Sequence, residues 1–242
     1  MSLDIVIPAH DEEARIERTL HAYRSGFPQD DVRFHIALDG CVDTTADIVR
    51  AHAADDDRVL LHEFPKLGKG GVLMETFRLC QADLVGFVDA DCATPPGELA
   101  RMTVEAADVD GVIASRRLPA SFTPGPRHER RSLTSAGFAW GVRWLFRLPY
   151  ADTQCGAKVL HRRVTERVVP LMSSRDFLFD VDLLVTARRL GFEVVEVPTV
   201  WIDQAGSKLR AWQDSVHMLR SAMRLWIHHR TMPIVTDAMD AR

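Results

Sequence analysis

Two aspartates one residue apart, Asp89 and Asp91, are the strongest candidates for chemistry in this 242-residue sequence. They directly follow an apolar run at residues 84–88, which is typical of a buried strand. Residues i and i+2 of an extended segment point to the same side, so both carboxylates can reach one divalent cation. Such a cation would neutralise a bound diphosphate. Acidic residues after strands are often only helix caps, and the pair alone does not separate the two interpretations.

The first half of the sequence predicts repeated strand–helix units around this pair. We expect strands at 3–7, 34–38, 59–61, 84–88 and 112–114, and helices at 12–24, 44–53, 70–80 and after Thr94-Pro95. Repeated β-α-β units imply a mostly parallel α/β sheet flanked by helices. Ligands of such open sheets bind beyond the carboxyl ends of the strands, where the two aspartates would lie.

The second half has a different character. Residues 121–131 are rich in Pro, Gly and Arg, which indicates a loop. We expect an apolar, Trp-containing helix at 133–148, helices at 180–190 and 210–229, and extended segments at 194–197 and 199–202. A further short unit opens at residues 152–156.

Composition excludes several classes of protein. A net charge of −4 argues against a general nucleic-acid binder. The segment Met1–Asp4 lacks the basic and apolar parts of an export signal, and the four cysteines are scattered, so we expect reduced thiols in the cytosol. No apolar stretch reaches the roughly 20 residues that cross a bilayer.

Several segments, taken in order, resemble inverting family 2 glycosyltransferases. Residues 5–13 (IVIPAHDEE) resemble the family's opening "IVIPAYNEE", residues 38–45 (LDGCVDTT) its "DDGSTDGT", and residues 67–71 (LGKGG) its "NxGKGxA". Asp89-Ala90-Asp91 matches its metal motif. Residues 152–158 (DTQCGAK), 179–184 (FDVDLL), 196–198 and 206–208 are similar to its later segments. Order and spacing point to the polyprenyl-phosphate branch, the dolichyl-phosphate glucose and mannose synthases.

The resemblance implies a GT-A fold that binds a nucleotide sugar, UDP-glucose or GDP-mannose. One domain would span residues 1–230, with the donor bound by 1–118 and the acceptor by 119–230, followed by a tail at 231–242. The donor-binding residues carried over are Pro8, Ala9, Glu12, Asp39, Lys69, Asp89, Ala90 and Asp91. Asp89 and Asp91 would hold Mn²⁺ or Mg²⁺. From the residues alone, Asp39 could instead start a turn, Glu12 could favour a helix dipole, and Lys69 could be a solvated loop lysine.

Some positions depart from the family pattern. His10 and Asp11 replace its Tyr and Asn, and Asp182 replaces its Glu. Ala93 stands where mannose synthases tend to have a metal-binding amide, which favours the glucose-type relatives.

A basic group of residues suits an anionic acceptor. Arg116 or Arg117 corresponds to the arginine of the family's "GSR" element, and Arg131 and Ser135 resemble its "RxxxS" acceptor element, so the resemblance implies that these four residues bind the acceptor phosphate. Arg127 and Arg130 lie nearby in the sequence, and a solvated basic loop is the alternative. Guanidinium groups bind phosphate in a fork geometry. Two like unit charges 4 Å apart repel by about 4 kcal/mol at an effective dielectric constant of 20, so a lipid phosphate cannot approach a diphosphate without cations. The residues expected to act in catalysis are Asp89, Asp91, Arg117 and Arg131.

The predicted reaction is in-line attack by a polyprenyl phosphate oxygen on the anomeric carbon, with inversion. A phosphate monoester is largely dianionic at pH 7, so no strong base is needed. Trp140, Trp144 and the basic tail helix suit interfacial helices, and we expect peripheral attachment to the cytoplasmic face of a membrane. Packing of these stripes on the core is the alternative.

Two other functions compete with this one. A soluble hydroxyl acceptor would need a general base, for which Asp180 or Asp182 is the candidate. A non-catalytic nucleotide-sugar-binding subunit is the other, and the intact acidic pair argues against it.

Overall fold

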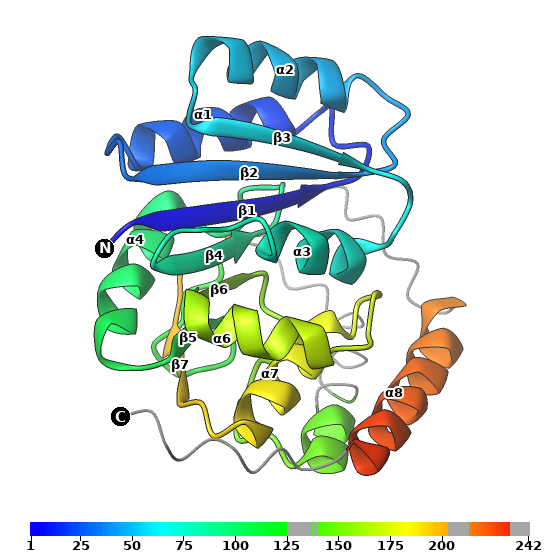
Figure 1. The fold of residues 1–242 in the computed structure, drawn as a ribbon. Helices are drawn as coiled ribbons and strands as arrows, with labels where there is room; N and C mark the ends of the chain where they lie inside the picture. The colour runs from blue at the N-terminus through cyan, green and yellow to red at the C-terminus, as the bar shows by residue number, and fades with distance from the viewer. Residues whose placement is uncertain (125–136, 138–139, 203–212, 233–242) are drawn as a thin grey trace.

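A seven-stranded sheet is the centre of the computed structural model, which describes residues 1–124, 137, 140–202 and 213–232 (Figure 1). The strands are β1 (Leu3–Ala9), β2 (Val32–Asp39), β3 (Val59–Phe64), β4 (Leu84–Val88), β5 (Gly111–Ser115), β6 (Ala157–His161) and β7 (Val194–Pro198). Their order is β3-β2-β1-β4-β6-β5-β7. Neighbours are parallel except β6, which runs antiparallel to β4 and β5. The expectation of a mostly parallel α/β sheet is confirmed.

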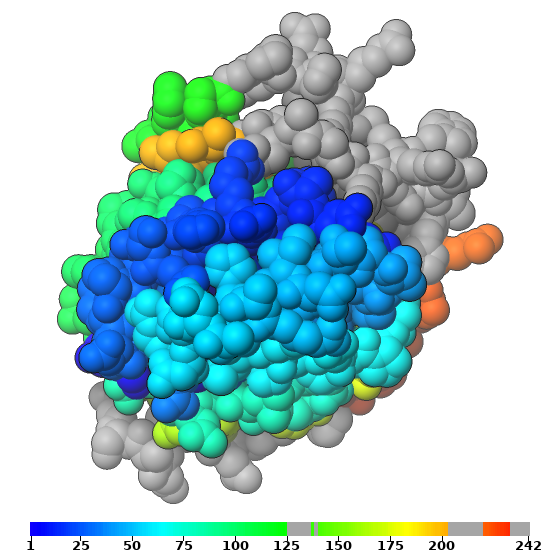
Figure 2. All heavy atoms as spheres, turned by 90° about the horizontal axis from the view of Figure 1, so that it is seen from above, coloured from blue at the N-terminus to red at the C-terminus, as the bar shows by residue number. Residues whose placement is uncertain are grey.

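Helices cover both faces of this sheet (Figure 1). One face carries α1 (Ile16–Gly26), α2 (Thr45–Asp55) and α4 (Pro96–Glu105), which leads into the short η1 (Ala106–Asp108). The other carries α3 (Lys69–Phe77), α6 (Arg162–Val168), α7 (Phe179–Arg189), a helix at residues 140–146 and α8 (Gln213–Thr231), with the short η2 (Val169–Leu171) after α6. At the β3 edge, α1, α2 and β3 form the surface seen from above (Figure 2).

Successive residues of a strand pack alternately into the two hydrophobic cores, one on each face of the sheet. Ile5 and Ile7 of β1 pack toward α1, while Val6 between them belongs to the core on the α3 side. Both faces of the strands are therefore buried, as a sheet between two helical layers requires. On the α3 side, Phe77, Phe87 and Phe179 form a cluster of rings with centroids 5.9–6.1 Å apart.

The predicted elements differ from the observed ones in three places. The first helix begins at Ile16 rather than residue 12, because residues 10–13 form a loop bonded to the segment after β2. Strand β6 and helix α6 were not predicted, since Lys158 interrupts the apolar pattern. Residues 199–202, expected to be extended, make only an isolated bridge between Val200 and Phe122.

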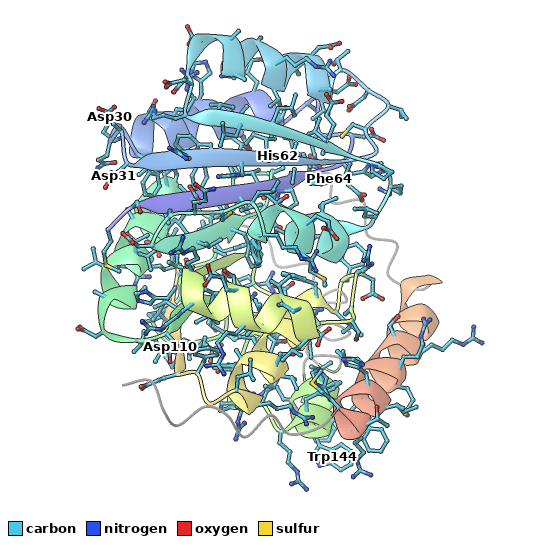
Figure 3. The ribbon with its side chains drawn as sticks, viewed as in Figure 1. Asp30, Asp31, His62, Phe64, Asp110 and Trp144 are labelled. Carbon is cyan, nitrogen blue, oxygen red and sulfur yellow. The ribbon has the colours of Figure 1, made fainter. Side chains whose placement is uncertain are left out.

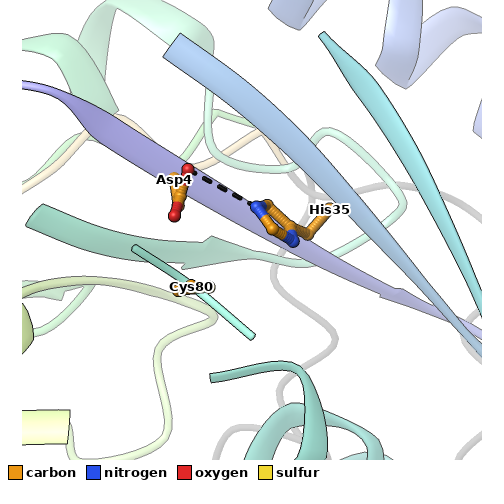
Figure 4. A group of neighbouring side chains, drawn as sticks. All are labelled: Asp4, His35 and Cys80. Carbon is orange, nitrogen blue, oxygen red and sulfur yellow. Dashed lines mark ion pairs between the residues drawn. The ribbon is translucent and has the colours of Figure 1, made fainter. Parts of the chain in front are cut away.

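A buried polar cluster fixes the segment after α3 to the start of β1 (Figure 4). Asp4 Oδ2 accepts the N–H groups of Gln81 and Ala82 at 2.7 and 3.0 Å, and Asp4 Oδ1 lies 3.4 Å from His35 Nε2. Burial raises the pKa of Asp4, whereas His35 and these two N–H groups lower it. The lowering is the larger effect, so the pKa of Asp4 lies below its ordinary value. The cluster, which includes the buried Cys80, therefore has a structural role.

Candidate active site

Most predicted site residues meet at one edge of the sheet, where the parallel strands end. Strands β1, β2, β4 and β5 finish there at Ala9, Asp39, Val88 and Ser115. The reversed strand β6 begins at the same edge, because Val88 is paired with Ala157. The donor residues that follow β1, β2 and β4 are thereby placed beside the arginines that follow β5.

Helix α1 holds the turn that carries Asp89 and Asp91. Thr19 Oγ1 donates to Ala90 O at 2.7 Å, and the buried Tyr23 hydroxyl donates to Thr94 O at 2.8 Å. Arg18 Nη2 donates to the Asp91 carbonyl at 3.1 Å. The path of this turn is thus set by side chains of a helix that the sequence could not place against it.

The acidic pair has the donor chemistry of a divalent cation site. Asp89 Oδ1 lies 2.6 Å from Lys69 Nζ, and Asp91 Oδ1 accepts the Ala93 N–H at 3.0 Å. Burial, with the charge of Asp89 in addition, raises the pKa of Asp91. Hard carboxylate oxygens whose charges repel each other suit Mn²⁺ or Mg²⁺, so the residues present fit such an ion.

Gly156 gives the Asp89 carboxylate its space. The Asp89 N–H donates to Gly156 O at 3.2 Å, which keeps the two backbones together. A Cβ on Gly156 would lie 1.9 Å from Asp89 Oδ2, far inside van der Waals contact. The absence of a side chain at Gly156, within the 152–158 motif, therefore leaves room for the Asp89 carboxylate. The sequence did not reveal this connection between the two motifs.

The predicted nucleoside residues already have partners within the protein. Asp39 is 4% exposed, and its Oδ1 accepts the N–H groups of Leu67 and Gly68 at 2.6 and 3.0 Å. Glu12 makes a two-point ion pair with Arg15, at 2.6 and 2.7 Å. Asp39 thus fixes the loop at residues 67–68, and Glu12 lies before the first turn of α1. Pro8 and Ala9 form the end of β1.

The loops after β1 and β2 are joined by acidic side chains. Asp11 Oδ1 accepts the Val42 N–H at 2.8 Å, and Glu13 Oε2 accepts both the N–H and the hydroxyl of Thr44. Asp11 adopts a φ of 52°, a left-handed conformation that aspartate tolerates. Sequence reasoning noted Asp11 only as a departure from the family pattern.

Two lysines contact the ring of Phe87, two residues before Asp89. Lys158 is fully buried, and its Nζ lies 2.6 Å from Asp180 Oδ1 and 2.9 Å from Cys155 O. The Nζ atoms of Lys69 and Lys158 lie 5.8 and 5.2 Å from the centroid of the Phe87 ring. Burial lowers the pKa of Lys69, but the charges of Asp89, Asp180 and Asp91 outweigh it and raise that pKa above its ordinary value. Lys69 is therefore a paired cation, not a solvated loop lysine.

Among the residues predicted to bind the acceptor, Arg116 is held by an ion pair. Its Nε and Nη2 donate to the two oxygens of Asp152 at 2.7 and 2.9 Å. Glu196 in turn accepts the N–H groups of Ala151 and Asp152 at 2.7 and 2.6 Å. Burial lowers the pKa of Arg116, but the Asp152 contacts raise it overall. Asp152 of the 152–158 motif thus holds the Arg116 guanidinium, and Glu196 of the 196–198 segment in turn holds Asp152.

The other acceptor residues are placed differently. Arg117 is exposed, and its N–H donates to Ser115 Oγ at 3.2 Å. Arg131 and Ser135, with Arg127 and Arg130, lie outside the described residues, so their predicted role stays a prediction.

Asp180 and Asp182 are buried and have charged or polar partners within the protein. Asp180 pairs with Lys158 as described, and Asp182 accepts the N–H groups of Ser173 and Ser174 at 2.7 and 2.8 Å. His229 Nε2 lies 2.8 Å from the other Asp182 oxygen. Both carboxylates are therefore buried with partners inside the protein.

The class of protein follows from a comparison with known families. The family described as Glycosyl transferase family 2 matches residues 4–165. The chain belongs to this family and is a glycosyltransferase with a GT-A-type fold, which confirms the resemblance noted in the sequence.

Curated relatives narrow the class further. The glycosyltransferase AglD of Haloferax volcanii is 30% identical over 243 residues, which cover 98% of this chain and 39% of AglD. The undecaprenyl-phosphate mannosyltransferase of Micrococcus luteus is 30% identical, covering 82% of this chain and 83% of the enzyme. The dolichyl-phosphate beta-glucosyltransferase of Dictyostelium discoideum is 27% identical, covering 92% and 73%. These names agree with the polyprenyl-phosphate branch.

Solved structures share the fold. Glucosyl-3-phosphoglycerate synthase of Mycobacterium tuberculosis, in complex with Mn²⁺, uridine diphosphate and glucosyl-3-phosphoglycerate, superposes with a TM-score of 0.69. Its sequence is 18% identical, and the match covers 96% of this chain and 81% of that one.

Proposed function

We propose that this protein transfers a hexose from a nucleotide sugar to a polyprenyl (dolichyl-type) phosphate, with inversion and with the help of a divalent cation. The observation that carries the proposal is the edge of the sheet, where Asp89, Asp91 and Lys69 lie beside the arginines after β5. Relatives named for transfer to dolichyl and undecaprenyl phosphate support a lipid phosphate as acceptor. Their names include both glucose and mannose, so UDP-glucose and GDP-mannose are the donors to test.

On the donor side, Asp89 and Asp91 would hold Mn²⁺ or Mg²⁺, whose charge would stabilise the departing nucleoside diphosphate. Pro8, Ala9, Glu12 and Asp39 would line the nucleoside pocket, Ala90 would lie between the two metal ligands, and Lys69 would face the diphosphate. A nucleoside that donates to Asp39 would compete with its contacts to the loop at residues 66–68.

On the acceptor side, one phosphate oxygen of the lipid forms a bond to the anomeric carbon as the bond from that carbon to the diphosphate breaks. The electron pair leaves with the nucleoside diphosphate, and an α-linked donor gives a β-linked product. The dianionic phosphate needs no base, so Arg117 and Arg131 have only to orient it and offset its charge. Arg116, bound by Asp152, and Ser135 would complete this anion site.

A soluble hydroxyl acceptor is less well supported. It requires a base, and the two candidates, Asp180 and Asp182, are buried in ion pairs and hydrogen bonds. The intact metal pair likewise gives no support to a non-catalytic binding subunit.

Arg117→Ala and Arg131→Ala test the acceptor site. Each change is expected to reduce transfer from UDP-glucose or GDP-mannose to polyprenyl phosphate by roughly 10- to 100-fold, because a hydrogen bond to a charged group contributes about 1.5–3 kcal/mol. The measurement is formation of the labelled lipid-phosphate sugar with Mn²⁺ present. Arg163→Ala, which removes an exposed arginine bonded to Asp110, is the control. Variants that transfer at the wild-type rate would contradict the arginine site, and transfer to soluble hydroxyl acceptors alone would contradict the lipid acceptor.

A patch of exposed tryptophans supports attachment to a membrane surface. Trp140 and Trp144, on the helix at 140–146, are 68% and 73% exposed. Figure 3 shows Trp144 on the outside of the molecule near α8. Met223 and Ile227 of α8 are 48% and 51% exposed, and the two helices meet where Phe146 contacts His229, with ring centroids 6.3 Å apart. Exposed arginines flank the patch at positions 143, 147, 220, 224 and 230. Tryptophans with flanking cations are typical of helices that lie in a membrane interface.

Only part of the predicted interfacial stripe is exposed. Leu225 is 3% exposed, and Leu145 and Phe146 pack against the core, as the alternative interpretation expected. No helix in the described part of the chain is long and apolar enough to cross a bilayer. We propose peripheral attachment, and the cytoplasmic face stays a prediction.

The double change Trp140→Ser and Trp144→Ser is expected to weaken binding to anionic liposomes at least tenfold, because burying one large apolar side chain contributes roughly 1.5–3 kcal/mol. Flotation on a density gradient measures the bound fraction. Val104→Ser, which removes a 74% exposed apolar side chain from α4 on the opposite face of the sheet, is the control. Equal flotation of the double variant and the wild type would contradict membrane binding through Trp140 and Trp144.

A further inference from the structure

Lys69 lies where a cation at the acidic pair would have to bind. Its Nζ is 2.6 Å from Asp89 Oδ1, and the side chains of Lys69 and Asp89 are only 24% and 30% exposed. Partial burial strengthens such a contact over a solvated ion pair. A divalent cation that used this oxygen of Asp89 would place its two charges against the lysine ammonium. The lysine must therefore leave before the cation can be fully bound.

The loop that leads into Lys69 is bonded to Asp39 of the predicted nucleoside pocket. Lys69 is the first residue of α3, and Gly68 before it has a φ of 81°. The N–H groups of Leu67 and Gly68 donate to Asp39 Oδ1, and Lys66 Nζ lies 3.0 Å from Asp39 Oδ2. All these contacts of the loop at residues 66–69 converge on Asp39. A ligand that donates hydrogen bonds to Asp39 would compete with the Leu67 and Gly68 N–H groups and so would loosen the loop that holds Lys69 on Asp89.

We propose that Lys69 is a latch on the metal site: its ammonium occupies Asp89 in the free enzyme and moves to the donor diphosphate when a nucleotide engages Asp39. The inference rests on the proposed function and adds an order of events to it. The enzyme would bind the cation weakly on its own and more strongly with nucleotide. A positioning role for Lys69 thus accompanies its role as a donor contact.

Charge balance gives the exchange its direction. Before binding, one ammonium offsets one carboxylate. After binding, the cation offsets the two carboxylates and shares the diphosphate with Lys69, so no like charges are left adjacent. Because binding free energies are reciprocal, nucleotide must raise the affinity for the cation by the same factor as the cation raises the affinity for nucleotide.

The test is Mn²⁺ binding to the full chain without nucleotide, measured by electron paramagnetic resonance of free Mn²⁺. Lys69→Gln is expected to bind Mn²⁺ about tenfold more tightly than wild type, which corresponds to about 1.4 kcal/mol. Lys69→Arg keeps the charge and should stay within about threefold of wild type. Arg78→Gln removes the charge of a partly exposed arginine at the end of α3, which pairs with Glu75 rather than with Asp39 or Asp89, and so measures the general effect of one lost positive charge.

Asp39→Ala gives a second, independent test. It frees the loop but removes a negative charge, which by itself would weaken cation binding. Tighter Mn²⁺ binding by this variant therefore supports release of the latch and has no simple electrostatic explanation. Unchanged or weaker binding in both Lys69→Gln and Asp39→Ala overturns the latch, as does an Arg78→Gln effect equal to that of Lys69→Gln.

Failure of the latch is distinguishable from failure of the proposed function. If Asp91→Ala binds Mn²⁺ as wild type does, the cation is not at the acidic pair, and both proposals fall. If Asp91→Ala loses binding while Lys69→Gln does not gain it, the metal site stands and only the latch is wrong. Addition of UDP or GDP should tighten Mn²⁺ binding in wild type much more than in Lys69→Gln.

Discussion

Replacing Asp91 by alanine is expected to lower sugar transfer by about three orders of magnitude. A bound cation contributes several kcal/mol of charge stabilisation to such a reaction, and about 4 kcal/mol corresponds to roughly a thousandfold in rate. Asp91 is half-buried, and the hydrogen bond that its side chain accepts from the Ala93 N–H lies within its own turn, so the fold should tolerate the change. The measurement is kcat/KM for transfer to polyprenyl phosphate over a range of Mn²⁺ concentrations.

The matched control for this change is Asp57→Ala. Asp57 is exposed in the turn before β3, at the opposite end of the sheet. The Asp57→Ala variant should therefore transfer sugar at the wild-type rate. Full activity of Asp91→Ala, or a loss that excess Mn²⁺ restores completely, would conflict with direct ligation by this carboxylate.

The change Gly156→Ala is expected to reduce transfer by about a hundredfold without a ligand or acid being removed. The new Cβ would meet Asp89 Oδ2 at 1.9 Å and turn the carboxylate away, and a displacement of about 1 Å in a reacting group can cost two orders of magnitude. Stability should fall by about 1–3 kcal/mol, as for other crowded substitutions. Transfer kinetics and thermal unfolding together measure the two effects.

Gly97→Ala separates crowding from the general effect of adding a methyl group. Gly97 lies in the first turn of α4, with no atom within 4 Å of an added Cβ, so activity should not change. Activity of Gly156→Ala close to wild type would mean that Asp89 does not need its present orientation.

The strand-end positions could be predicted from the sequence because short apolar runs followed by acids have a simple physical reading. Residues 84–88 form β4, and Asp89 follows it as expected. The apolar runs in the first half of the sequence predicted the first strands and helices in their observed order for the same reason. Hydrophobic periodicity does not report direction, however, and the reversed strand β6 was missed since its buried Lys158 breaks the apolar pattern.

The partners of the site residues could not be predicted, because they come from distant parts of the chain. Lys69 meets Asp89 across 20 residues, and Arg116 meets Asp152 across 36. Each pairing depends on which strands are neighbours, which no local pattern encodes. The resemblance named Asp39 as a donor contact, but only the fold links it to the loop that carries Lys69.

Manganese located in a crystal of the wild-type protein with donor nucleotide is the most direct test of the metal-bridged site. Anomalous diffraction is expected to place one Mn²⁺ between the Asp89 and Asp91 carboxylates and the diphosphate, with Lys69 Nζ moved away from Asp89. Nucleotide bound at this edge of the sheet with no manganese at residues 89–91 would contradict the account.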